Sequence, residues 1–137
     1  MKKVYYGKAV YDNREINAVI KVLKNDSLSL VDGNNVKLLE KKVSSIFGKK
    51  YGLMVNSGSS ANLLALQCLI NPYRKNRLKK GDEVIIPTLC WSTSLWPIIQ
   101  SNLKPVFIDI NPMTLNIDES QIEKKITKKS GRYLLKN

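Results

Sequence analysis

Histidine is absent from this sequence, and cysteine occurs only twice in its 137 residues. Because histidine is the commonest general base and the commonest metal ligand among side chains, its absence argues against catalytic-triad chemistry and against a zinc hydrolase. The two cysteines, Cys68 and Cys90, form no CxxC pair and have no metal-ligand spacing. We therefore interpret both as small buried residues in a reducing compartment, and we expect no metal site.

Long hydrophobic runs are also lacking. No apolar stretch approaches the roughly 18 to 20 residues that a membrane-spanning helix needs, and the first residues lead into tyrosines and charges rather than into a signal-peptide core. We therefore expect a soluble, cytoplasmic chain with no membrane partner. With 137 residues, the chain is long enough for one modest domain with its own core, and its hydrophobic fraction of 43% is ordinary for a globular protein.

The formal charge is +12, and it is concentrated in two clusters. Their members are Arg74, Lys75, Arg77, Lys79 and Lys80 in the first, and Lys124, Lys125, Lys128, Lys129 and Arg132 in the second. A basic surface can recruit nucleic acid or another polyanion. Neither cluster is interleaved with aromatics or sits in a recognisable nucleic-acid module, so the pattern favours solvated faces, and a polyanion-binding module is the remote alternative.

The first 50 residues have the pattern of a helical segment. Asp12 and Glu15 have capping-box spacing, and the apolar residues that follow at helical spacing predict an amphipathic helix ending near Lys24. After a break at 25–27, the stretch 28–35 reads as an extended piece with a turn at Asp32 and Gly33. A second helix follows, with one apolar face and with a glycine to stop it: Val36, Leu39, Val43, Ile46, Phe47 and Gly48.

The stretch that organises the rest of the chain begins at Gly52. Residues Gly52 to Val55 read as a buried strand, and Asn56 to Ser60 are turn formers and helix-capping residues. Ala61 to Leu69 are strongly helix-forming and almost wholly apolar, which is typical of a helix sandwiched inside a domain.

Further strands and helices alternate after this helix. Glu83 to Ile86 form a β-rich run closed by Pro87, and Val106 to Ile110 form another. Between them lies a helix whose apolar face comes from Leu95, Ile98 and Ile99; it must begin near Ser94 if Pro97 is to lie in its first turn, and a weaker helix runs from Glu119 to about Lys128. The alternation predicts an α/β fold with a mostly parallel sheet, and it indicates an incomplete α/β domain over 51–137.

In such sheets ligands gather at the carboxyl ends of the strands. Three groups fall at these ends: Ser57 to Ser60, Pro87 to Trp91, and Asp109. The amides that begin the helix after Ser57 form a plausible anion cradle, in which Gly58 lets the backbone approach a phosphate. A serine-rich N-cap that serves only the helix explains these residues equally well.

The two tryptophans have different interpretations. Trp91 follows a strand end, where an indole can stack on a flat heteroaromatic ring whose phosphate is held at Gly58 and Ser59; packing explains Trp91 equally well. Trp96 lies inside the helix, and its position favours core packing.

The sequence resembles the DegT/DnrJ/EryC1/StrS family of pyridoxal-phosphate sugar aminotransferases and their sugar dehydratase relatives. The resemblance rests on EINAVIKVL, on the spacing from LVDG through VKLLEKKVSSIFGKKYGLMVNSGSSANLLAL, and on GDEVIIPTLCWSTSLWPIIQSNLKPVFIDINPMTLNID. It covers essentially Val10 to Thr127. It implies part of the large domain of PLP-dependent transferase fold type I, a three-layer α/β/α architecture. The wording SGSSANLLAL, with a basic insert before GDEVI, looks most like the branch that contains the nucleotide-sugar 3-dehydratases and the 3-dehydratase-like aminotransferases.

Site residues implied by the resemblance are carried over only where the motifs match. Gly58 and Ser59 match the family's phosphate-binding pair, Ser60 continues that turn, and Trp91 matches the aromatic that stacks on the pyridine ring. The implied cofactor is pyridoxal 5′-phosphate (PLP) or pyridoxamine phosphate (PMP). The segment around Asp32 and Gly33 matches a loop near the sugar-nucleotide site, but no substrate-binding residue is assigned.

The catalytic groups of the family have no counterpart in this sequence. In the family a downstream lysine forms the Schiff base, histidine replaces it in the dehydratases, and an aspartate pairs with the pyridine nitrogen. Neither region is present here, so we assign no catalytic residue and expect cofactor binding without turnover.

The implied function is therefore that of an amino-terminal portion of a nucleotide-sugar aminotransferase, a fragment or truncated product. The whole enzyme would move an amino group from an amino acid such as glutamate to a keto sugar nucleotide. Alternatives are a fragment of a 3-dehydratase of the same family and a non-catalytic partner subunit. Family members imply a homodimer, and a nucleic-acid partner is not expected.

Overall fold

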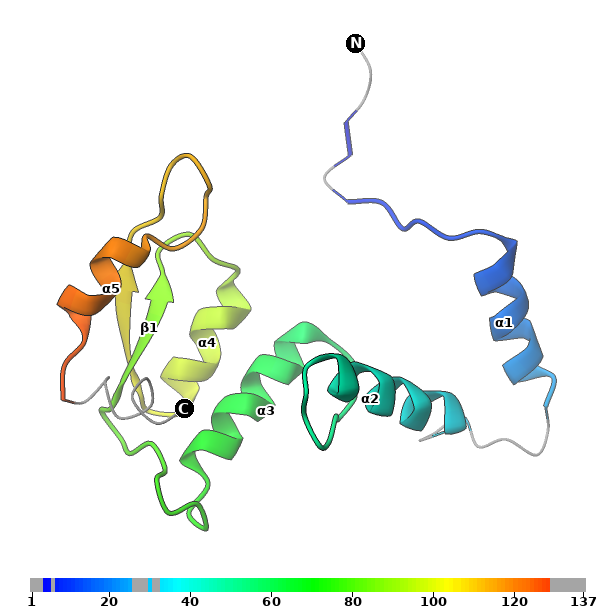
Figure 1. The fold of residues 1–137 in the computed structure, drawn as a ribbon, viewed down its shortest axis with the longest axis horizontal. Helices are drawn as coiled ribbons and strands as arrows, with labels where there is room; N and C mark the ends of the chain where they lie inside the picture. Colours follow the sequence, from blue (N-terminus) through cyan, green and yellow to red (C-terminus); the bar gives the residue numbers. More distant parts are fainter. Residues whose placement is uncertain (1–3, 6, 26–29, 31–32, 129–137) are drawn as a thin grey trace. The chain divides into compact units, whose positions relative to one another are not determined.

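The computed structural model describes residues 4–5, 7–25, 30 and 33–128. The chain packs as two units, Met1–Met54 and Val55–Asn137, and each is described by itself (Figure 1). Several sequence expectations lie outside the described residues: most of the break at 25–27, half of the stretch 28–35 including Asp32, and the last two basic residues of the second cluster, Lys129 and Arg132.

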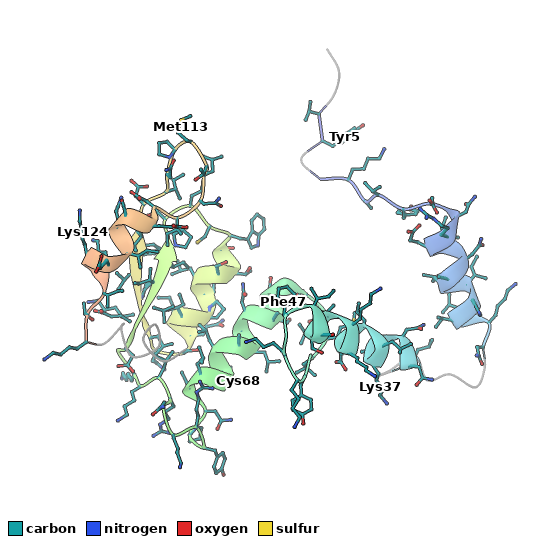
Figure 2. The ribbon with its side chains drawn as sticks, in the orientation of Figure 1. Tyr5, Lys37, Phe47, Cys68, Met113 and Lys124 are labelled. Carbon is teal, nitrogen blue, oxygen red and sulfur yellow. The ribbon has the colours of Figure 1, made fainter. Side chains whose placement is uncertain are left out.

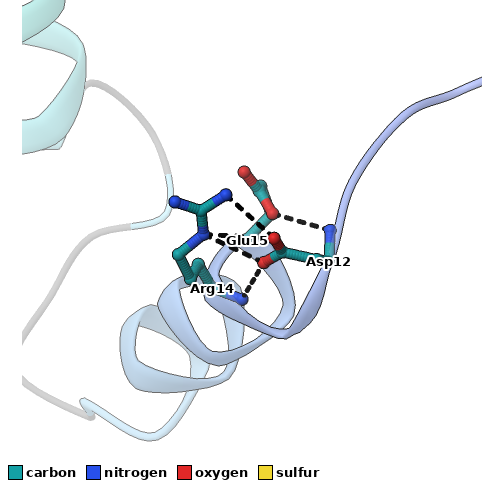
Figure 3. A network of polar contacts seen from close by, with 3 residues as sticks. All are labelled: Asp12, Arg14 and Glu15. Atoms are coloured by element: carbon teal, nitrogen blue, oxygen red, sulfur yellow. Dashed lines mark hydrogen bonds and ion pairs between the residues drawn. The ribbon is translucent and has the colours of Figure 1, made fainter.

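The first unit begins with α1 (Asn13–Leu23), and its cap has the predicted form. The Asp12 side chain accepts a hydrogen bond from the Arg14 amide at 2.7 Å, while the Asp12 amide donates to Glu15 Oε2 at 2.8 Å (Figure 3). Lys24 is the C-cap. The capping box and the end of this helix are therefore confirmed.

The second helix, α2 (Asn34–Ile46), starts two residues before the predicted Val36, because Gly33 already serves as N-cap. Gly48 follows the helix with φ of 60°, a left-handed conformation that glycine adopts without strain, and this confirms the predicted stop.

The strand predicted for Gly52 to Val55 does not form, and this prediction was wrong. A strand needs a partner for its backbone groups, and none of the described residues pairs with this segment. Residues 52–54 instead fold back on α2. The Met54 amide donates to Glu40 Oε1 at 2.8 Å, and Gly52 packs directly against the Glu40 carbonyl.

The second unit confirms the predicted α/β class. It contains α3 (Gly58–Ile70), β1 (Glu83–Pro87), α4 (Ser92–Gln100), β2 (Lys104–Ile108) and α5 (Glu119–Lys125). The two strands pair in parallel, with Glu83 opposite Lys104 and Pro87 opposite Ile108. Helix α4 packs on both strands and on α3, whereas α5 packs on β2 from the other side of the sheet (Figure 1).

The core of this unit lies between the sheet, α3 and α4. Its buried members are Leu78, Ile86, Ile98 and Leu103, against which α3 places Leu66, Leu69 and Ile70. The expectation of a sandwiched α3 is not met, because within the described chain only one face of the helix is packed. Cys68, labelled in Figure 2, is consequently exposed, which corrects the prediction that it is buried. Cys90 is half-buried.

Helix α4 also differs from expectation. It begins at Ser92 rather than near Ser94, so Pro97 lies beyond the first turn, where it has no N–H to donate to the Thr93 carbonyl. Trp96 is 60% exposed rather than part of the core, because the buried face of α4 is set by Leu95 and Ile98. The following strand, β2, ends at Ile108 instead of Ile110.

Candidate functional site

The site is built around the first turn of α3. Ser57 is the N-cap, and its Oγ accepts a hydrogen bond from the Ser60 amide at 3.2 Å and donates to Ser60 Oγ at 3.1 Å. The Ser57 carbonyl accepts the Ala61 amide at 3.0 Å. The serine-rich turn is thus a true helix cap, and the Ser60 amide is used by the protein itself.

The amides of Gly58 and Ser59, unlike the Ser60 amide, are not used by the helix cap. Among the described residues neither has a hydrogen-bond acceptor, and both belong to the positive end of a 13-residue helix. A Cβ added to Gly58 would meet nothing within 4 Å, so the packing of the chain does not explain the glycine. Two unused amides beside open space are a geometry that fits a phosphate.

A hollow of about 270 Å³ adjoins this turn. Its walls come from α3 and α4: Ser59, Ser60, Leu63, Thr93, Trp96, Pro97 and Gln100. The hollow combines hydroxyl groups, a primary amide and an indole, a lining that suits a flat polar molecule. Sequence reasoning missed Thr93 and Gln100, although positions 93, 96, 97 and 100 share one face of a helix.

Trp91 lies elsewhere. It is the N-cap of α4 and 66% exposed, and the hollow beside Ser59 is lined by Trp96 instead. The site residues predicted from the sequence are therefore brought together in part. Gly58, Ser59 and Ser60 lie in one helical turn. The Trp91 side chain is exposed at the start of α4 and does not line the hollow.

The carboxyl ends of β1 and β2 meet as expected. Thr88 follows β1, and both its amide and its hydroxyl donate to the Ile108 carbonyl, at 2.8 and 3.0 Å. Asp109 follows β2, but its side chain accepts the Ile110 amide at 2.8 Å, and its carbonyl accepts the Asp118 amide at 2.9 Å. Asp109 therefore holds the turn between β2 and α5 in place.

A metal site and a membrane span are two further possibilities for the described part of the chain. No group of three or more His, Cys, Asp or Glu residues there is arranged to hold a metal ion. The same residues include no helix with both the length and the apolar character to cross a bilayer.

Comparison with known proteins gives concordant findings. The sequence profile of the DegT/DnrJ/EryC1/StrS aminotransferase family matches residues 10–135. The chain is similar to the GDP-4-keto-6-deoxy-D-mannose 3-dehydratase of Yersinia pseudotuberculosis, with 39% identity over 129 residues, which are 94% of this chain and 32% of that protein.

Solved structures agree in fold. The E. coli GDP-4-keto-6-deoxy-D-mannose-3-dehydratase with bound hydrated PLP superposes with a TM-score of 0.78 at 38% identity, over 89% of this chain and 31% of that one. The PLP form of the putative sugar aminotransferase Spr1654 from Streptococcus pneumoniae superposes with a TM-score of 0.74 at 26% identity, over 94% and 31%. The chain spans about a third of the length of these relatives.

Proposed function

The chain belongs to the DegT/DnrJ/EryC1/StrS aminotransferase family, and from this premise we propose that it provides the phosphate-binding and ring-covering part of a PLP or PMP site. The enzyme so formed would modify a keto sugar nucleotide. The observation that carries the proposal is the pair of unused amides, Gly58 and Ser59, at the positive end of α3.

Each residue of the proposed site has a distinct part. The Gly58 and Ser59 amides donate to the cofactor phosphate, and the Ser59 hydroxyl adds a third donor. Ser60 contributes through its hydroxyl, because Ser57 accepts its amide. Trp91 covers the ring, which its exposed position at the start of α4 allows. When bound, the cofactor supplies an electron sink for chemistry next to a carbonyl carbon.

For the reaction itself we favour 3-dehydration of a sugar nucleotide. Of the relatives described above, the two that are 3-dehydratases by name are 39% and 38% identical to this chain, whereas the aminotransferase structure is 26% identical. Amino transfer from an amino acid such as glutamate, which the sequence analysis placed first, remains the second candidate because the family is named for it. No residue of this chain is assigned to proton transfer, so cofactor binding without turnover is the expected behaviour of the chain.

We also retain three finer expectations as parts of the proposal. Residues 1–50 form a helical segment, residues 51–137 carry the cofactor site, and the enzyme works as a homodimer. Analytical ultracentrifugation of the chain, with and without PLP, measures the last of these directly.

The proposal is tested by titrating the chain with PLP and following tryptophan fluorescence. Gly58→Val fills the open space above the amides, so we expect the dissociation constant to rise at least about tenfold, a loss of about 1.4 kcal/mol. Gly7→Val is the matched control, because a Cβ at Gly7 also meets nothing within 4 Å. Equal PLP affinity in the Gly58 variant and the wild type contradicts the proposal.

The same titration tests the ring-covering residue. If Trp91 lies over the ring, Trp91→Ala removes most of the quenching that PLP causes, and Trp96→Ala retains it. The reverse result would move the ring into the hollow between α3 and α4 and would leave the phosphate assignment intact. Loss of quenching in neither variant would refute stacking altogether.

A further inference from the structure

The described ends of the two basic clusters, which are far apart in the sequence, lie close together in the unit Val55–Asn137, because residues next to them are in contact. Glu83 begins β1 directly after the first cluster, and its Oε2 accepts a hydrogen bond from Thr127 Oγ1 at 2.6 Å. Its Oε1 forms an ion pair with Lys104 Nζ at 3.4 Å. Because Thr127 follows α5, these contacts hold the end of α5 beside the start of both strands.

We call this surface the amino edge, because it lies at the amino-terminal ends of β1 and β2. Its cationic side chains are all exposed: Arg74, Lys75, Arg77, Lys79, Lys80, Lys104, Lys124, Lys125 and Lys128. Figure 2 shows one of them, Lys124, on α5.

The backbone below the cationic side chains is held in place. Leu78 is buried in the core and its amide donates to the Leu69 carbonyl at 2.9 Å, so the middle of the first cluster is anchored. The Lys79 amide donates to Asp82 Oδ2 at 2.8 Å, and Asp82 is itself buried. The cations on either side of Leu78 therefore project from a fixed loop.

Few anionic side chains oppose the cations of the amino edge. Asp82 is buried, and the Glu83 side chain is 10% exposed and engaged by Lys104 and Thr127. The acids close to the second cluster in the sequence are Asp118, Glu119 and Glu123, and Asp118 interacts electrostatically with Lys124. The potential of this edge is consequently positive.

The arrangement fits a flat anionic surface better than a nucleic acid. The cations come from a loop, the start of a strand and the end of a helix, whereas DNA-binding modules present one helix or β-ribbon to a groove. Single-strand binders present several stacking aromatics. Among the described residues the first cluster adjoins only Tyr73, which is 94% exposed beside Arg74. Tyrosine has an amphipathic ring that suits the headgroup region of a bilayer.

We propose that the amino edge docks the protein onto an anionic phospholipid membrane. The lysine and arginine side chains attract the headgroup phosphates, and Tyr73 lies at headgroup level. The edge is at the opposite ends of the strands from Thr88 and Asp109, so docking leaves the carboxyl ends of the strands accessible. The sequence alone favoured solvated faces, because it did not reveal that the described ends of the two clusters lie close together.

The test is co-sedimentation of the chain with vesicles of phosphatidylcholine and phosphatidylserine, compared with vesicles of phosphatidylcholine alone. The chain binds the mixed vesicles, and binding falls as ionic strength rises from about 0.1 to about 1 M, because the Debye length shortens from about 10 to about 3 Å. Lys79→Gln with Lys80→Gln, and separately Lys124→Gln with Lys125→Gln, each weaken binding at least about tenfold.

The matched control is Lys41→Gln with Lys42→Gln on α2, which removes the same charge from an exposed helix of the other unit. It changes vesicle binding less than about threefold, and circular dichroism verifies that each variant keeps the wild-type helix content. An equal loss in the α2 variant would show that net charge alone is measured and would overturn the proposal. So would tight binding to duplex DNA without binding to mixed vesicles, which would assign the edge to nucleic acid.

Discussion

At the scale of single residues, Gly52 shows how one small side chain permits a close backbone contact. A Cβ at this position would lie 2.6 Å from the Glu40 carbonyl oxygen, which belongs to the backbone of α2 and has little freedom to move. We expect Gly52→Ala to displace the segment 52–54 and to strain its hydrogen bond to Glu40. The predicted cost is about 1–3 kcal/mol in the free energy of unfolding, measured by urea denaturation.

Gly7→Ala is the control for this prediction, because its new Cβ meets nothing within 4 Å. Its free energy of unfolding should stay within about 0.5 kcal/mol of the wild type. If both alanine variants are equally stable, the close approach of Gly52 to α2 is not a constraint on the fold.

The residues of the candidate site differ in whether their sequence neighbours are enough to identify them. Ser57 and Gly58 were found from the sequence because capping and glycine chemistry depend on a few adjacent residues. Trp96 was misassigned to the core, and Gln100 was missed, because their place in the hollow depends on how α4 packs against α3. The exposure of Cys68 has the same origin: an apolar neighbourhood in the sequence does not determine which face of a helix is covered.

At the scale of elements, helices were predicted better than strands, since a helix satisfies its hydrogen bonds within one segment. Helix α1 follows its capping box. A strand needs hydrogen bonds to a second segment, which its own residues do not specify. The strand predicted at 52–55 does not form, whereas β1 forms because β2 pairs with it. Helix boundaries were less certain, as α4 shows by beginning two residues early despite Pro97.

The cap of α1 gives a prediction about pH. The Arg14 side chain, and then the Arg14 amide, hold the pKa of Asp12 below the ordinary aspartate value of 3.8. A carboxyl group with a lowered pKa in the folded state stabilises that state above its unfolded pKa, and the effect is lost as pH falls through the folded pKa. We therefore expect α1 to lose helix content below about pH 3.8, measured by the NMR shifts of its backbone.

Arg14→Ala provides the check. Removing the guanidinium raises the pKa of Asp12 toward its ordinary value, so the loss of helix is complete at a higher pH than in the wild type, and a carbon-detected NMR titration of the Asp12 carboxyl follows the change. Asp118 is the internal control, because the Ser120 hydroxyl and the Gln121 side chain are the leading causes that lower its pKa. An unchanged Asp12 titration in the variant would refute the role given to Arg14.

At the scale of the whole molecule, the alternation of strands and helices predicted the α/β class, and the parallel pairing of β1 with β2 confirms it. The location of the core was predicted less well. Leu78 lies in a polar, basic stretch and is nevertheless buried, because it belongs to the cluster that Ile98 of α4 and the apolar residues of α3 complete. Burial of this kind depends on contacts between distant segments, which a local pattern does not specify.

Ile98 and Ile99 test the assigned core with two adjacent, chemically identical side chains. Ile98 is 2% exposed among Ile86 and Leu103, whereas Ile99 is 55% exposed. Ile98→Ala removes buried methyl groups and leaves a cavity, so the free energy of unfolding should fall by about 2–5 kcal/mol. Ile99→Ala should change it by less than about 0.5 kcal/mol. Urea denaturation measures both, and comparable losses in the two variants would mean that α4 packs on the sheet through a different face.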